Sequence, residues 1–161
     1  RMRIAEYLHV DLADDTTLKL ASVANIVGIK DATGNLERGK YLIANRPAGF
    51  AVYSGDDPTA MELCLMGGDG DISVTANVAP ALMASMISHA LAGDRSAAEA
   101  ENTKLLGLHR ALFLEPNPIP SKWALAQMGF MRADCRLPLV PLTDAGATEV
   151  RQACAQAGVA L

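Results

Sequence analysis

The stretch that decides the fold is NIVGIKDATGN at residues 25–35. Its first part, through Lys30, is short, apolar and β-branched, which is typical of a buried strand that ends in a charge. Residues 31–35 have the composition of a turn. A helix is expected from about Leu36 to Asn45, before the proline at position 47. The segment therefore predicts one strand–loop–helix unit.

The same unit recurs downstream. A second strand is expected over 50–53, a loop over 54–57, a helix from Pro58 to about Met66, and a third strand over 71–75. Strands and helices that alternate at this spacing form βαβ units, and hence a parallel sheet. Both faces of such a sheet are covered, which explains strands that are apolar throughout. Upstream, Asp15 or Thr16 is expected to cap a short helix that ends near Ser22.

After Pro80 the pattern becomes entirely helical. Helices are expected over about 82–91, 96–114 and 121–128, and a last helix capped by Thr143 or Asp144 runs to about Ala157. The chain is therefore divided into an α/β part, residues 1–80, and a helical part, residues 81–161.

Composition and charge exclude several classes of protein. The net charge of −4 and the pI near 5.3 argue against a nucleic-acid or anionic-membrane surface. No apolar run is long enough to span a bilayer. The three cysteines fit neither a disulfide framework nor a zinc site, and no two histidines have ligand spacing, so no metal is expected. Reduced thiols favour a cytoplasmic protein.

Lys30 is the strongest candidate for chemistry. The carboxyl ends of parallel strands are where α/β proteins usually carry their active sites. An amine that is partly removed from water there loses its proton more easily and becomes a nucleophile, able to form a Schiff base with a keto acid. The alternative is an ordinary surface lysine at a strand end.

The loop SGDD at residues 54–57 follows the second strand at the matching position. Gly55 would let a ligand approach the backbone closely. The alternative is a helix N-cap, since Ser and Asp beside Pro58 are good capping residues. The downstream GGDG at residues 67–70 lacks the Lys-Ser/Thr of a phosphate loop and precedes a strand, so it is interpreted as a turn.

Four segments together resemble the Schiff-base pyruvate aldolases of the dihydrodipicolinate synthase type. They are GIKDATGN at 28–35, YSGDD at 53–57, GGDGDISVTAN at 67–77 and EPNPIPSKW at 115–123. The lysine segment suits several pyruvate aldolases, whereas the Asn-Pro-Ile-Pro-x-Lys pattern points to this family. The resemblance covers roughly residues 11–161.

The resemblance implies the C-terminal portion of a (β/α)8 TIM barrel, with three parallel strands, followed by a C-terminal helical extension. It implies that Lys30 forms an imine with pyruvate and that the enamine attacks aspartate β-semialdehyde, giving 4-hydroxy-tetrahydrodipicolinate for lysine biosynthesis without a cofactor. Gly55 and Ile72 match substrate-binding positions. The remaining positions implied to lie near the site are Thr33, Ser54, Asn117 and Pro118.

Some features of the family have no match. Its Tyr-Asn-Val-Pro-x-Arg-Thr segment, with a proton-relay tyrosine and a carboxylate-binding arginine, should place that arginine near Tyr7, where the pattern is absent. The threonine pair of the relay belongs to the first strands of the barrel. Three strands cannot close a barrel. We therefore expect a fragment of a homo-oligomeric enzyme. The alternatives are another pyruvate aldolase, such as N-acetylneuraminate lyase or a keto-deoxy sugar acid aldolase, and a non-catalytic, self-associating fragment.

Overall fold

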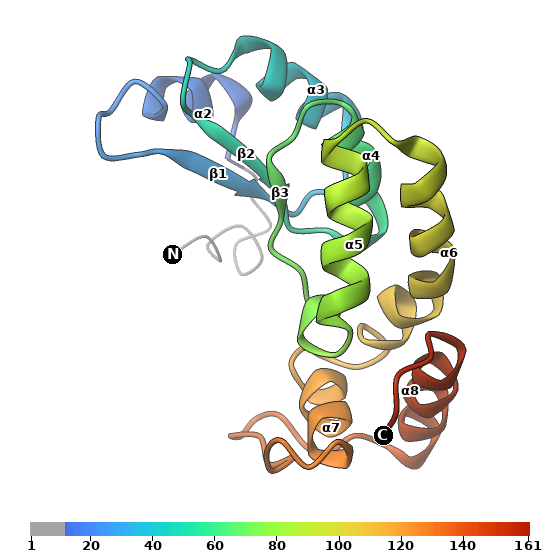
Figure 1. Ribbon diagram of the computed structural model, residues 1–161. Helices are drawn as coiled ribbons and strands as arrows, with labels where there is room; N and C mark the ends of the chain where they lie inside the picture. Colours follow the sequence, from blue (N-terminus) through green and yellow to red (C-terminus); the bar gives the residue numbers. More distant parts are fainter. Residues whose placement is uncertain (1–11) are drawn as a thin grey trace.

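The computed structural model describes residues 12–161 and contains a parallel sheet flanked by helices (Figure 1). The strands are β1 (Gly28–Asp31), β2 (Ala51–Ser54) and β3 (Gly70–Asp71), in the order β1-β2-β3. Both pairings are parallel, with Lys30 opposite Tyr53 and Tyr53 opposite Gly70. This confirms the predicted α/β architecture of three parallel strands with helices.

Three helices accompany the strands: α2 (Asp14–Leu20), α3 (Leu36–Asn45) and α4 (Asp57–Leu65). The Asn35 side chain caps α3 by accepting a hydrogen bond from the backbone N–H of Arg38. The expected cap of α2 was wrong, because this helix already begins at Asp14 and Ala13, which has no capping oxygen, occupies the N-cap. Helix α3 packs on the sheet through a small core of Leu42, Phe50 and Val52.

The C-terminal helices are α5 (Pro80–Leu91), α6 (Arg95–Ala111), α7 (Ile119–Gln127) and α8 (Asp144–Gln156). Thr143 caps α8 as predicted, accepting from the Gly146 N–H. Figure 1 shows α5 and α6 side by side and α7 and α8 at the end of the molecule away from α2. Fully buried apolar side chains fill the space between these helices, among them Met86, Leu105, Leu108, Leu112 and Val150. No helix within residues 12–161 has the length and apolar character needed to cross a membrane.

The third strand is shorter than predicted. It ends at Asp71, and a 3-10 helix, η1 (Thr75–Asn77), occupies the end of the expected strand. Side chains divert this backbone from the sheet, because the Thr75 N–H donates to a carboxylate oxygen of Asp57 at 2.8 Å and the Ala76 N–H donates to the Ser73 hydroxyl at 2.8 Å. Such local side-chain hydrogen bonds compete with strand ladders.

Candidate active site

Lys30 lies near the carboxyl end of β1, one residue before the strand ends. Successive strand residues point to opposite faces of a sheet. Asp31 and Ser54 face the helices and are buried, so Lys30 and its register partner Tyr53 face the other side. On that side Tyr53 is 36% exposed and Ile72 is 50% exposed. Lys30 is therefore half-buried at the carboxyl edge of the sheet, on its open face.

Gly55 lies directly against the Lys30 side chain. A Cβ atom at Gly55 would be 2.2 Å from Lys30 Cε and 2.9 Å from Lys30 Cγ. The backbone of Gly55 is fixed, because its N–H donates to the Asp31 carbonyl at 2.8 Å. The absence of a side chain at Gly55 thus gives the Lys30 stem its path across the end of β2. The binding role expected for Gly55 stays a prediction.

Ile72 follows the last residue of β3. Its backbone N–H donates to the Ser54 carbonyl at 2.9 Å, which ties the end of β3 to the loop that begins with Gly55. Lys30, Gly55 and Ile72 are therefore brought to the same edge of the sheet from three adjacent strand ends. The substrate-binding role expected for Ile72 stays a prediction.

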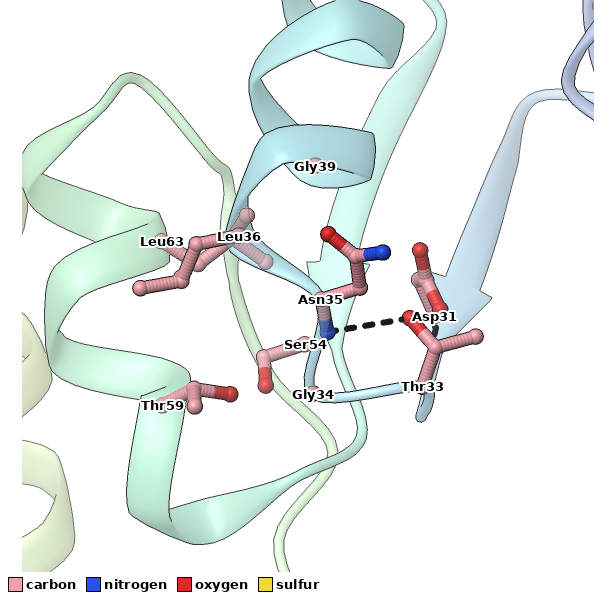
Figure 2. Close-up of a pocket in the computed structure, with 9 residues that line it drawn as sticks. All are labelled: Asp31, Thr33, Gly34, Asn35, Leu36, Gly39, Ser54, Thr59 and Leu63. Carbon is pink, nitrogen blue, oxygen red and sulfur yellow. Dashed lines mark hydrogen bonds between the residues drawn. The ribbon is translucent and has the colours of Figure 1, made fainter.

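Ser54 and Thr33 lie behind this edge, on the helix side. They line a small pocket between β1, α3 and α4, shown in Figure 2 together with Asp31 and Asn35. The Asn35 N–H donates to the Thr33 hydroxyl at 3.2 Å, and the Thr33 N–H donates to Asp31 at 2.9 Å. The cavity holds about 10 Å³, room for roughly one water molecule. Lys30 does not line this cavity. The side chains that line it therefore support the turn that follows β1.

Asn117 and Pro118 lie just before α7 and are joined by a cis peptide bond. Helix α7 contacts η1, which follows β3, so the segment is on the carboxyl side of the sheet. Within residues 12–161, no hydrogen bond joins either residue to Lys30. Their expected proximity to the reacting groups therefore stays a prediction.

The dihydrodipicolinate synthetase family model matches residues 5–157, which is most of the chain. The chain belongs to this family. It is 56% identical over 151 residues to the 4-hydroxy-tetrahydrodipicolinate synthase of Nitrosospira multiformis, an alignment that covers 94% of this chain and 50% of that protein. The corresponding enzyme of Stutzerimonas stutzeri is 54% identical over 149 residues, covering 92% of this chain and 51% of the relative.

Solved structures of the family share the fold. The chloride-inhibited dihydrodipicolinate synthase from Acinetobacter baumannii, complexed with pyruvate, superimposes with a TM-score of 0.91 at 51% identity, covering 94% of this chain and 52% of that one. The synthase from Aquifex aeolicus gives a TM-score of 0.92 at 33% identity, with 98% and 54% covered. The chain thus spans about half the length of the relatives it matches and carries three strands of their TIM barrel.

Within this family fold, one group of buried polar residues was not anticipated from the sequence. Asp57, Thr75 and His109 are at most 3% exposed. The Thr75 hydroxyl and His109 Nδ1 are 2.9 Å apart, and burial lowers the pKa of His109 despite the nearby charges of Asp57 and Asp56. His109 is therefore a buried packing residue that joins α6 to η1. The family arginine expected near Tyr7 lies outside the described residues.

Proposed function

We propose that Lys30 is the nucleophile of a pyruvate-dependent lyase and forms an imine with the keto carbon of pyruvate. The observation that supports this most strongly is the packing of the Lys30 stem on Gly55, which directs the amine along the carboxyl edge of the sheet. Barrel enzymes carry their catalytic groups at this edge. The amine adds to the carbonyl, and loss of water leaves the imine.

In the proposed reaction the imine accepts electrons when a proton leaves the pyruvate methyl carbon, giving an enamine. That carbon then attacks the aldehyde of aspartate β-semialdehyde, and the aldehyde oxygen takes up a proton to become a hydroxyl. The amino group of the same semialdehyde adds to the imine carbon and displaces the Lys30 amine, which closes the ring of 4-hydroxy-tetrahydrodipicolinate, an intermediate of lysine biosynthesis. The names of the relatives, at 52% to 56% identity in the best matches, support this second substrate over the sugar-acid substrates of other pyruvate aldolases.

The proposed reaction needs no metal or organic cofactor, because the imine itself is the electron sink. Within residues 12–161, no group of three or more His, Cys, Asp or Glu side chains is arranged to hold a metal ion. Dialysis against a chelator should therefore leave imine formation unchanged. We also propose a cytoplasmic location, supported by three cysteines that form no disulfide.

We further propose that the chain assembles with copies of itself. Among residues 12–161, strands β1 and β3 are the edges of the sheet, and Tyr53 and Ile72 on one of its faces are exposed. Unpaired strand edges beside exposed apolar side chains favour pairing with another chain. A monomeric dihydrodipicolinate synthase variant is known among the structural relatives, so the state in solution must be measured by analytical ultracentrifugation.

The decisive test of the proposed function is borohydride reduction in the presence of pyruvate. The 161-residue chain should gain one pyruvyl group, and peptide mass spectrometry should locate it at Lys30. Lys30→Ala should gain none, whereas Lys122→Ala, which removes another partly buried lysine, should react like the parent chain. Labelling at a different lysine, or equal labelling of the Lys30→Ala variant, would contradict the assignment.

A further inference from the structure

Two carboxyl groups meet on the helix side of the sheet, behind the edge that carries Lys30. Asp71 ends β3 and is the register partner of Ser54, so its side chain faces away from the Lys30 side. Asp57, the first residue of α4, is 2% exposed. Helix α4 packs against β3, which brings the Asp57 and Asp71 carboxyl groups together. Asp71 as a whole is half-buried, but both of its carboxyl oxygens are shielded from water.

The hydrogen bonds of this pair are incomplete when both groups are ionised. One Asp57 oxygen accepts from the Thr75 N–H at 2.8 Å, but Asp57 Oδ1 is buried without a donor. Both oxygens of Asp71 are also buried without a hydrogen bond of normal geometry. Three buried acceptors without donors are costly, since each loses its hydration. Two adjacent buried carboxylates also repel each other.

A single proton removes most of this cost. We propose that Asp57 and Asp71 share one buried proton, and that Asp71 as a carboxylic acid is a positioning residue that holds the β2–β3 edge beneath Lys30. Protonated Asp71 donates to the free oxygen of Asp57. The pair then has one negative charge, and one O–H···O bond between charged and neutral partners replaces the repulsion.

The surroundings of the two carboxyl groups favour Asp71 as the residue that carries the proton. Burial raises the pKa of Asp57, but hydrogen bonds from Ser73, the Thr75 N–H and Asp71 outweigh it, so the net shift is downward. Burial, and then the neighbouring Asp57, raise the pKa of Asp71 to about 8 against smaller opposing effects of Ser54 and Lys30. Environments that separate two carboxyl pKa values in this way define which group carries the proton.

Asp71 is joined through the backbone to the edge of the sheet that carries Lys30. Asp71 immediately precedes Ile72, whose N–H is bonded to the Ser54 carbonyl, and Gly55 follows Ser54 and supports the Lys30 stem. Ionisation of Asp71 puts a second negative charge beside Asp57, and the repulsion acts on the strand end that holds this loop. The edge should therefore loosen as the pH rises.

Several other ionisable groups act on the pair. The Cys64 thiol on α4 and the His109 ring on α6 face the pair, and the Lys30 charge acts on Asp71 from the other face of the sheet. Helix α5, which packs on β3, has one ionisable side chain, His89, in its last turn. Burial and then Asp71 raise the pKa of Cys64 to about 11, so this thiol stays neutral while the pair titrates. The titration of the Cys64 thiol is therefore separable from that of the Asp71 carboxyl.

The proton itself is tested by carbon-13 NMR of the aspartate carboxyls and by thermal unfolding of the 161-residue chain between about pH 6 and pH 9. A carboxyl whose folded pKa is raised contributes stability in full below its unfolded pKa of about 3.9 and loses it as the pH rises through the folded value. The parent midpoint should therefore fall across this range. Asp71→Asn, whose amide donates to Asp57 and cannot ionise, should flatten the profile.

Two controls define the test of the proton. Asp134→Asn, which neutralises an exposed carboxylate, should keep the parent slope, and Asp71→Ala, which leaves Asp57 without its donor, should be less stable than Asp71→Asn throughout. A parent Asp71 carboxyl that is fully ionised at pH 6, or equal slopes for the parent and Asp71→Asn, would overturn proton sharing.

The positioning role is tested by hydrogen exchange of the Ile72 amide. Relative to Asp71→Asn at the same pH, this amide should exchange at least tenfold faster in the parent above pH 8 and equally at pH 6. A constant ratio would overturn the positioning role.

The importance of the edge for catalysis rests on the proposed function: trapping of pyruvate at Lys30 should fall in the parent relative to Asp71→Asn above pH 8. No trapping in any variant would contradict the role of Lys30 and leave the exchange and NMR results to decide the proton.

Discussion

A methyl group added at Gly55 tests how the reactive lysine is positioned. In Gly55→Ala the new Cβ would lie 2.2 Å from Lys30 Cε, whereas ordinary contact begins at 3.4 Å, so Cε must move by at least the difference, about 1.2 Å. Ala32 Cβ, 3.0 Å from the added atom, limits how far the alanine can shift instead. A misplacement of about 1 Å at a reacting group costs on the order of 10²-fold in rate. We expect pyruvate trapping at Lys30 to slow by roughly this factor.

The assay is a time course of borohydride quenching with pyruvate, followed by intact mass. Gly55 does not have a positive φ, so alanine should leave the backbone unstrained and change the free energy of unfolding by less than about 1 kcal/mol. Gly107→Ala is the matched control, because its added methyl group is closer than ordinary contact only to the flexible end of Gln156, at 3.1 Å, and lies at ordinary contact distance from Ala153. Gly55→Ala trapping pyruvate at the parent rate while folded would refute the proposed packing of Lys30.

Three further outcomes follow from the same structure. Arg38→Ala should lower the free energy of unfolding by about 3 kcal/mol in urea titrations, because the buried Asp31 carboxylate loses its partner at 2.9 Å, whereas Lys40→Ala in the same helix should have little effect. Thr75→Val should cost about 1–3 kcal/mol of unfolding free energy by leaving His109 unpaired. Because burial lowers the pKa of His109, the contribution of this histidine to stability should be complete above about pH 6.5 and be lost as the pH falls. The 161-residue chain alone should consume aspartate β-semialdehyde at a small fraction of the rate of an intact family enzyme, because a positioned proton-transfer group contributes about 10²–10⁴-fold and the tyrosine and threonine relay of the family has no match here.

The first two strands and the helices could be predicted closely from the sequence. Their signals are local: a short β-branched run before a charge at Lys30, turn residues after it, and Pro58 and Pro80 at helix starts. The predicted strand over 25–30 began too early and ended one residue too soon, because the residues paired with β2 run from Gly28 to Asp31. Errors of this size are usual at the ends of elements.

The third strand shows where local propensity fails. Residues 72–75 are Ile-Ser-Val-Thr, which favours a strand, but the Asp57 carboxylate and the Ser73 hydroxyl capture backbone N–H groups that a longer strand would donate to its neighbour. Asp57 is supplied by a helix 18 positions before Thr75 in the sequence. The propensity of the segment contains no information about that distant acceptor.

The same limit applies to the buried carboxyl pair. The sequence shows Asp57 beside a helix-starting proline and Asp71 at the start of the predicted third strand, and each has an adequate local interpretation, as a cap residue and as a strand residue. Their meeting depends on the register that aligns Ser54 with Asp71 and on α4 returning across the same strand end. A register one residue different would send the Asp71 carboxyl to the Lys30 face.

Because successive residues of a strand point to opposite faces of the sheet, the two faces of this edge carry different groups. Lys30 and Ile72 face the open side, where a substrate can reach them, whereas Asp31, Ser54 and Asp71 face the helices and hold the strand ends. The family resemblance implies roles for Lys30 and Ile72 on the first side and for Ser54 on the second. Asp71 is on the second side, and Asp71→Asn changes only the charge behind Lys30 and Ile72. Differences in pH behaviour among members that share the lysine segment should accordingly be sought on the helix side of the sheet.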